Sequence, residues 1–437
     1  MEQGNGKALL PIGVFLLIYL GLGILYEYIF AIPMGFYHVP ILVAFLISLA
    51  VACLQNAEMT WEEKLEVMAK GVGDKNVIAM LLIFLTAGIF VGVAGRGSAE
   101  SVAYFLLSFL PVRFSVTGLF LISGFVATAM GTSVGTITLM IPIAVAVAEH
   151  TGFELAPCIA SIVGGAMFGD NLSFISDTTI AACNGQGCEM KDKFRENFKI
   201  ALPAAIVTMG IIFIRTPTGD GLAQRVTGEY DLIRMIPYLL VLAGSMMGKN
   251  VFLVLFLGIV SGSVITLATK GAQPVELLTS MGQGAAGMLE TAMVAILVSA
   301  MGALMAEKGG FRALLAIIKK IFRGKKGGSL GVGLLAGAMD IATANNTVAI
   351  VLANPIAREM AQEYHISPRK AASLLDTFSC IFQGMIPYGA QMLVAVSATM
   401  ELGGQVSAFE ILTSLYYPYM LLISSLVFIF ILPEKEE

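Results

Sequence analysis

The sequence predicts an all-α polytopic membrane protein with about 10–12 transmembrane segments. Hydrophobic residues make up 57% of the 437 residues, charged residues make up only 13%, and the mean hydropathy is +0.85. Stretches such as 8–24, 77–93, 200–214 and 251–268 carry no charged residue. Because a helix needs roughly 20 mainly apolar residues to cross a bilayer, these stretches are candidate spans.

An internal repeat organises these spans. Gly71 matches Gly284, and Gly97/Gly310, Gly124/Gly337 and Pro142/Pro355 match at the same ungapped spacing along the chain. Repeats of this size are typical of secondary transporters, which place their binding site where the repeats meet. We therefore expect N-terminal scaffold helices (1–57), a first repeat (58–215), a linker with connecting helices (216–270) and a second repeat (271–437).

The distribution of basic residues predicts that the two repeats are inverted. The stretch Arg312–Lys326 carries six Lys and Arg residues, whereas its counterpart Ala99–Arg113 carries only Arg113. Cytoplasmic loops collect Lys and Arg, so the two stretches are expected on opposite sides of the membrane. Two inverted repeats satisfy that condition.

Each repeat contains a place where its apolar pattern is interrupted. In the first repeat, Ala129–Thr136 divides an otherwise spanning helix, and in the second repeat Thr343–Thr347 stands at the same position. Irregular backbone survives at bilayer depth only where protein or a water-filled cavity satisfies it, and its free carbonyls can bind a cation. Gly131 and Gly135 alone would fit simple close packing of helices. The candidate binding residues at the two breaks are Thr132, Ser133, Asn345, Asn346 and Thr347.

A second polar stretch follows each break. In the first repeat, Gly169–Thr179 holds two carboxylates, and an acidic residue at bilayer depth usually marks an ion or proton path. At the repeat spacing Asp170 falls on Gln383 and Asp177 on Ala390, so the first repeat carries the charged chemistry. The candidate ion- or substrate-binding residues are Asp170, Asn171, Ser173, Ser176, Asp177 and Thr178, with Asp170 and Asp177 as the Na⁺ ligands.

Four further residues are secondary candidates. Asp340 precedes the second break and suits either ion binding or a structural hydrogen bond, and Glu290 lies within an apolar stretch where a proton role is open. Asp376 is the acidic residue nearest the second polar stretch, which also contains Gln383. Carboxylate, amide and hydroxyl oxygens suit a hard cation such as Na⁺. The three histidines lie outside these clusters, so we expect no cofactor, no enzymatic activity and no nucleic-acid partner.

Two motifs carry a resemblance to a known family. The segments Gly131–Thr136 and Phe168–Thr179, the latter ending in Ser176-Asp177-Thr178-Thr179, are similar to those of NhaC-type Na⁺/H⁺ antiporters within the ion transporter superfamily. Asn171 and Phe174 depart from the family pattern. The resemblance implies a multi-pass carrier of the bacterial plasma membrane with two inverted repeats and re-entrant hairpins. It also implies that Na⁺ and H⁺ are handled by the residues named above, and that the protein forms a homodimer.

The leading interpretation is therefore a secondary active transporter that exchanges Na⁺ and H⁺ by alternating access through intramembrane carboxylates. The alternative is a Na⁺- or H⁺-coupled transporter of an organic acid (malate/lactate type) or of an amino acid, because relatives of such a family include both. We expect no buried Arg or Lys in the polar clusters, which favours a cation over an anionic cargo. Helix N-termini can nevertheless hold a carboxylate, so the alternative stays open.

Overall fold

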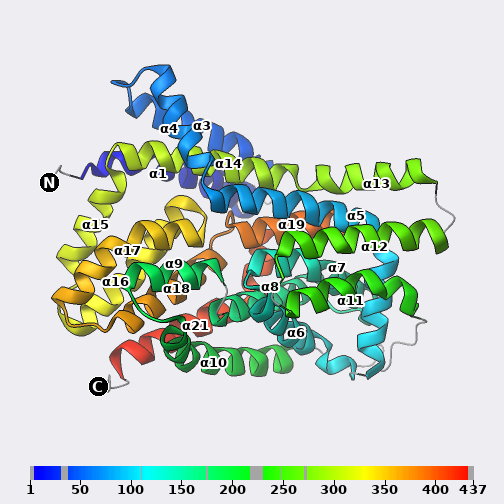
Figure 1. Cartoon of the computed structure of the whole chain (residues 1–437). Coiled ribbons are helices and arrows are strands. Elements are labelled where there is room, and N and C mark those ends of the chain that lie inside the picture. Colours follow the sequence, from blue (N-terminus) through cyan, green and yellow to red (C-terminus); the bar gives the residue numbers. More distant parts are fainter. Residues whose placement is uncertain are drawn as a thin grey trace.

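The computed structural model describes residues 4–30, 38–109, 111–173, 176–216, 230–247, 249–269 and 273–431. Every regular element in these ranges is a helix, which confirms the predicted all-α fold. The long helices run in roughly the same direction across the molecule, and both chain ends lie at the same end of it (Figure 1).

The segments predicted as the N-terminal scaffold (1–57) and the first repeat (58–215) contain ten α-helices in the described residues. They are α1 (Leu10–Leu16), α2 (Leu22–Ile24), α3 (Ile41–Gln55), α4 (Trp61–Val72), α5 (Lys75–Phe109), α6 (Ser115–Met130), α7 (Ser133–Thr151), α8 (Leu155–Leu172), α9 (Asp177–Gln186) and α10 (Met190–Arg215). A π-helical turn at Leu17–Gly21 joins α1 to α2, and a second π-helical turn at Leu25–Ile29 follows α2.

The rest of the chain adds the connecting helices and the second repeat. The connecting helices are α11 (Leu232–Met246) and α12 (Val251–Thr269). The second repeat comprises α13 (Pro274–Gly287), α14 (Leu289–Glu307), α15 (Gly310–Ile321), α16 (Gly324–Thr343), α17 (Asn346–Glu363), α18 (Pro368–Met385), α19 (Ala390–Glu401), α20 (Ala408–Ser414) and α21 (Tyr416–Phe430).

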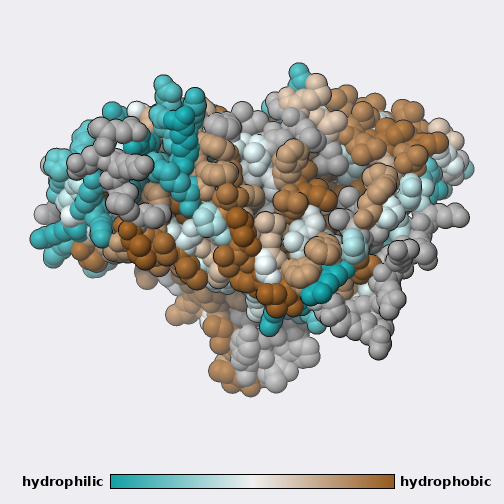
Figure 2. Space-filling model, turned by 90° about the horizontal axis from the view of Figure 1, so that it is seen from below, coloured by the Kyte–Doolittle hydropathy of each residue, from teal (hydrophilic) through white to brown (hydrophobic). Residues whose placement is uncertain are grey.

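The helices are long and apolar enough for a polytopic membrane protein. In the described ranges, eight helical segments could each cross a membrane, and the bent pair α20 and α21 is a ninth candidate. Three shorter apolar helices, at Ile41–Gln55, Val112–Thr128 and Leu232–Val241, accompany them. Hydrophobic residues cover much of the surface in Figure 2, whereas hydrophilic residues gather at its left end.

The helices of the two repeats correspond at the spacing found in the sequence. At the spacing that relates Gly71 to Gly284, both ends of α8 fall on the ends of α18, and the start of α7 falls on the start of α17. Helix α15 and the end of α5, which correspond at this spacing, lie at opposite ends of the molecule (Figure 1). This placement is what an inverted relation would produce, and the inversion itself stays a prediction.

The two breaks are real, but their geometry differs from the expectation of one divided spanning helix. Gly131 ends α6 with φ +70°, and Ala344 ends α16 with φ +47°. Helix α6 packs against α7, and α16 packs against α17, so each break is the tip of a hairpin. The helices that run on through a polar interruption are α8 with α9 (Leu155–Gln186) and α18 with α19 (Pro368–Glu401).

Helix α8 is deeply buried in the bundle, and its glycines let α6 approach it closely. A Cβ atom on Gly165 would lie 2.1 Å from the Phe120 carbonyl oxygen, and one on Gly169 would lie 2.0 Å from that of Gly124. Small residues at such crossings allow backbone contact in membrane proteins. The crossing fixes the position of Asp170, the residue that follows Gly169.

Candidate ion-binding site

The polar stretches of the two repeats meet in the middle of the molecule. Helix α9 of the first repeat packs against α17 and α18 of the second, and α19 of the second repeat packs against α7 of the first. The hairpin tips and the interrupted helices of both repeats therefore surround one region. Two helix N-termini, those of α7 and α17, begin at its edge.

Asp170 is the acidic centre of this region. Its carboxyl group is only 6% exposed and accepts hydrogen bonds from Ser133 Oγ at 2.8 Å and Ser176 Oγ at 2.6 Å. The hydroxyl groups of Ser176 and Thr178 lie 2.8 Å apart. Hydrogen bonds donated to a carboxylate stabilise its charged form, so the two serine donors offset part of the cost of burying a charged Asp170.

A small cavity lies beside Asp170. Its volume is about 10 Å³, which is enough for about one particle the size of a water molecule. Both repeats contribute its walls. The lining residues are Ser133, Met167, Asp170, Asn171, Thr178, Asn346, Asp376, Cys380 and Gln391.

A buried ion pair borders the cavity. Lys193 of α10 is only 1% exposed, and its Nζ donates to Asp376 Oδ2, to the Asn171 carbonyl oxygen at 3.0 Å and to Thr179 Oγ1 at 2.8 Å. Asn197, one turn further along α10, donates from Nδ2 to Asp376 Oδ2 at 3.2 Å and to Asn171 Oδ1 at 3.0 Å. The expectation that no basic side chain is buried among the polar clusters is therefore wrong.

The helical spacing of the residues around Lys193 could have identified its buried position. Lys193 lies in a run of basic residues between Lys191 and Lys199. In the structure the run forms the start of α10, and Lys193, Asn197, Ala201, Ala204 and Thr208 share the buried face. Their spacing of three to four residues is that of one helix face.

The charges around the cavity leave one negative charge unmatched. Asp170 and Asp376 are acidic, and Lys193 neutralises one of them. Burying an isolated charge costs several kcal/mol, so the site requires one positive charge. Gln391 Oε1 is buried and has no hydrogen-bond partner in the described part of the chain. Its amide nitrogen donates to Ser133 Oγ at 3.0 Å.

Gln391 was not among the predicted site residues, although the repeat could have identified it. Thr178 corresponds to Gln391 at the repeat spacing, Ser133 corresponds to Asn346, and all four line the cavity. The cavity therefore takes equivalent positions from both repeats. An oxygen-rich lining of this kind suits a hard monovalent cation. No group of three or more His, Cys, Asp and Glu side chains is placed to hold a metal in the ranges that the structure covers.

Several predicted residues support the site without lining the cavity. Thr132 caps α7 by accepting from the Gly135 amide, and Asn345 caps α17 in the same way by accepting from the Val348 amide at 3.0 Å. Ser173 Oγ donates to the Thr128 carbonyl oxygen at 2.8 Å and ties α8 to the first hairpin. The Thr347 amide donates to Asn346 Oδ1 at 3.0 Å.

Other predicted residues lie apart from the cavity. Asp177 begins α9 and is exposed, so the two acids of the motif face different surroundings. Glu290 is exposed in the first turn of α14. Asp340 is buried in α16, and Gln383 donates from Nε2 to the Ala344 carbonyl oxygen at 3.1 Å. Phe174 of the motif lies outside the described residues.

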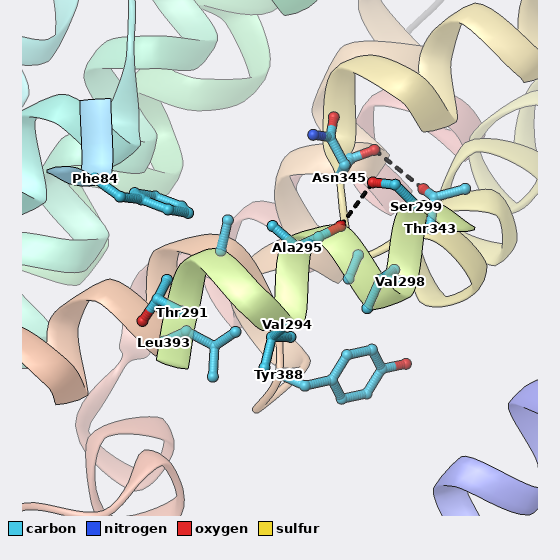
Figure 3. Close-up of a pocket in the computed structure, with 12 residues that line it drawn as sticks. Phe84, Thr291, Val294, Ala295, Val298, Ser299, Thr343, Asn345, Tyr388 and Leu393 are labelled. Atoms are coloured by element: carbon cyan, nitrogen blue, oxygen red, sulfur yellow. Dashed lines mark hydrogen bonds between the residues drawn. The ribbon is translucent and has the colours of Figure 1, made fainter. Parts of the chain in front are cut away.

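Two further cavities meet at the second break. The inner one, of about 20 Å³, lies between α14 and the end of α16, and Figure 3 shows Thr343, Asn345 and Tyr388 around it. The outer one, of about 200 Å³, shares Thr343 and Asn345 with it and extends to Lys70 and Asp74. The second break therefore borders a cavity that extends to the exposed residue Lys70.

The sequence matches the model of the Na⁺/H⁺ antiporter family over residues 8–216 and 230–432. The chain belongs to this family. It is therefore a multi-pass membrane protein of a transporter family, and the resemblance inferred from the two motifs is confirmed.

Curated relatives include two from Bacillus subtilis (strain 168). The malate-2H⁺/Na⁺-lactate antiporter is 22% identical over 385 residues, which cover 81% of this chain and 82% of that protein. The Na⁺/H⁺ antiporter NhaC is 22% identical over 387 residues, covering 80% and 85%. Among solved structures, the YdaH transporter of Alcanivorax borkumensis is 14% identical with a TM-score of 0.44, covering 88% of this chain and 96% of that one.

Proposed function

We propose that the protein exchanges Na⁺ for H⁺ by alternating access, with Asp170 as the carboxylate that both ions share. The supporting observation is the cavity beside Asp170, which has one unmatched negative charge, oxygen-bearing walls and room for a single water-sized particle. A dehydrated monovalent cation fits such a space, and an organic acid does not.

The residues around Asp170 have different roles when Na⁺ is bound and when a proton replaces it. When Na⁺ is bound, Asp170, Gln391 Oε1 and the hydroxyl oxygens of Ser133 and Thr178 are its ligands. When Na⁺ leaves, a proton on Asp170 restores neutrality, so the two ions exclude each other. Lys193 holds Asp376 in both states and keeps the unmatched charge at one. Because both repeats line the cavity, a relative movement of the repeats opens it to either side of the membrane.

The decisive experiment compares the two acids of the same motif. In proteoliposomes with a pH-sensitive dye inside, external Na⁺ is expected to raise the internal pH with native protein and to have no effect with Asp170→Asn. Asp177→Asn is the matched control, in the same motif but outside the cavity, and we expect it to retain exchange. Size-exclusion chromatography verifies that each variant is folded. Na⁺-driven exchange by a folded Asp170→Asn variant would contradict the proposal.

A second candidate function is coupled transport of a small organic acid. The cavity of about 200 Å³ at the second break favours it, because this space lies at the N-terminus of α17 and includes Lys70. A carboxylate is stabilised at a helix N-terminus, and one curated relative is named for malate and lactate. Na⁺-dependent uptake of labelled malate or lactate, lost in Asn345→Ala, is the outcome that would establish this function.

We further propose the bacterial plasma membrane as its location and a homodimer as its assembly. Both follow from the family resemblance. Cell fractionation and the mass of the detergent-solubilised protein measured by light scattering test these two points.

A further inference from the structure

Asp340 is a second deeply buried acid that the Asp170 site does not use. It lies in the last turn of α16 and is 0% exposed. Neither carboxyl oxygen has a hydrogen-bond partner among the residues that the structure describes. Asp170 is equally deep but receives two hydroxyl donors, so the two acids have opposite surroundings.

The surroundings of Asp340 disfavour a carboxylate. An ionised group without donors loses its hydration and gains no compensating hydrogen bond. The last turn of a helix is also the negative end of its dipole, which repels an anion. A bound proton removes both penalties and needs no cavity. These surroundings therefore favour the neutral carboxylic acid form of Asp340.

The adjacent helix offers an acceptor for this proton. The Asp340 carboxyl lies beside the backbone amide of Gln383 in α18, but no hydrogen bond of acceptable geometry joins the two groups. Gln383 donates from Nε2 to the Ala344 carbonyl oxygen, while its Oε1 is buried and has no donor in the described ranges. The neutral acid has one O–H to donate and Gln383 has one acceptor that is unsatisfied.

The charged and titratable neighbours do not supply a countercharge. Asp340 acts electrostatically on Tyr388, before α19, and on Cys380 of α18, which also feels Asp170, Asp376 and Lys193. Lys193 is committed to Asp376.

The other helices packed on α16 place their charged residues elsewhere along the sequence. Helix α21 contains none, α17 has none before Arg358, and those of α14 are Glu290 and Glu307 at its ends. The basic residues of α15 (Arg312, Lys319 and Lys320) precede the start of α16, which lies roughly 24 Å from Asp340 at 1.5 Å per residue.

The outer cavity at the second break comes close to Asp340 along α16. The outer cavity at the second break reaches from Lys70 and Asp74 to Thr343, which lies about one helical turn after Asp340. Ala344 follows in the left-handed region at φ +47°, a strained conformation for a residue with a Cβ atom. Strain of this kind is typical of segments that change conformation.

We propose that Asp340 is a proton-binding site separate from the Asp170 cavity, and that each transport cycle carries a proton on Asp340 in addition to the ion exchanged at Asp170. Gln383 accepts the hydrogen bond of the protonated form, and the cavity at the second break is where the proton enters or leaves. This inference rests on the proposed Na⁺/H⁺ exchange. It makes the exchange electrogenic, because one more proton than Na⁺ moves per cycle.

The test measures whether voltage drives exchange. In proteoliposomes, a K⁺ diffusion potential set with valinomycin is expected to drive Na⁺ movement by native protein and by the neighbouring control Met339→Leu. With Asp340→Asn, which is isosteric with the neutral acid, we expect Na⁺/Na⁺ exchange to persist while the response to voltage is lost. Loss of Na⁺/Na⁺ exchange in Asp170→Asn reports separately on the proposed function.

Two outcomes of the voltage experiment overturn the inference. A voltage response retained by Asp340→Asn would make Asp340 a permanently neutral structural residue, and loss of Na⁺/Na⁺ exchange in the folded variant would place Asp340 in the cation site instead. If Asp340→Asn does not fold, labelling of the native protein with a hydrophobic carbodiimide tests whether Asp340 carries a proton. This reagent modifies protonated carboxyl groups in apolar surroundings. We expect Asp340 to be labelled with and without Na⁺, and an unlabelled Asp340 would contradict the proposal.

Discussion

At the scale of single residues, three buried acids are distinguished by their partners. Asp170 has two hydroxyl donors and a cavity, Asp376 has the ammonium group of Lys193, and Asp340 has no donor in the described structure. Burial is nearly equal for the three, so the donors and charges around each acid decide its role.

The Lys193–Asp376 pair gives the first prediction at this scale. Lys193→Met leaves Asp376 buried without its countercharge, and removing one partner of a buried pair destabilises a protein by about 3–5 kcal/mol. We expect a lower melting temperature in detergent, measured by the fluorescence of a thiol-reactive dye.

The double variant Lys193→Met/Asp376→Leu separates charge from packing. Replacing a buried ion pair by apolar residues of similar size is often neutral or stabilising. We therefore expect it to recover most of the stability lost by Lys193→Met. A Lys193→Met variant as stable as the native protein would show that the pair is not needed to neutralise Asp376.

At the scale of elements, the close crossing of α6 and α8 positions the site. Gly165 and Gly169 bring α8 against the backbone of α6, and the bond from Ser173 to the Thr128 carbonyl oxygen joins the same two helices. Asp170 and Ser176 therefore keep their positions relative to Ser133 at the start of α7. The hydrogen bonds at Asp170 depend on this crossing as much as on the residues that form them.

Gly169→Ala tests the crossing. The added Cβ would lie 2.0 Å from the Gly124 carbonyl oxygen and 2.7 Å from the Thr128 amide nitrogen, so the helices must separate. Overpacking costs about 1–3 kcal/mol, and we expect a lower melting temperature together with weaker Na⁺-driven exchange. Gly210→Ala in α10 is the matched control, because a Cβ there meets nothing within 4 Å. Equal behaviour of the two variants would argue against a positioning role for the crossing.

At the scale of the whole molecule, the two repeats are joined through their polar parts. Helix α9 packs on α17 and α18, α19 packs on α7, and the cavity takes Ser133 and Thr178 from one repeat and Asn346 and Gln391 from the other. The proposed cation would contact both repeats, so its binding energy would stabilise the assembled fold.

Ligand-dependent unfolding measures this coupling. A ligand that binds only the folded state stabilises it by about 2.7 kcal/mol when its concentration is 100 times the Kd. We expect Na⁺ at constant ionic strength to raise the melting temperature of the native protein and of Asp177→Asn. We expect no increase for Asp170→Asn. An equal increase in all three proteins would place the stabilising Na⁺ somewhere other than at Asp170.

The sequence by itself determined the class of the protein and the two breaks, and it singled out Asp170 as a candidate ion-binding residue. These features depend on local composition: long apolar stretches must lie in lipid, Gly131 and the Thr343–Thr347 segment interrupt helices, and a carboxylate among apolar residues is costly. The constant spacing between matched residues of the two repeats also predicted which helices correspond.

Only the tertiary structure decided which side chains surround Asp170. Lys193 and Asp376 are 183 residues apart, and Gln391 and Ser133 are 258 apart. Asp177 looked equivalent to Asp170 in the motif, yet the polar interruption between α8 and α9 leaves it exposed. A linear pattern specifies which residues share a helix face, but the facing of one helix toward another results from packing across the whole bundle. The charge balance of the site was therefore visible only after the helices had been assembled.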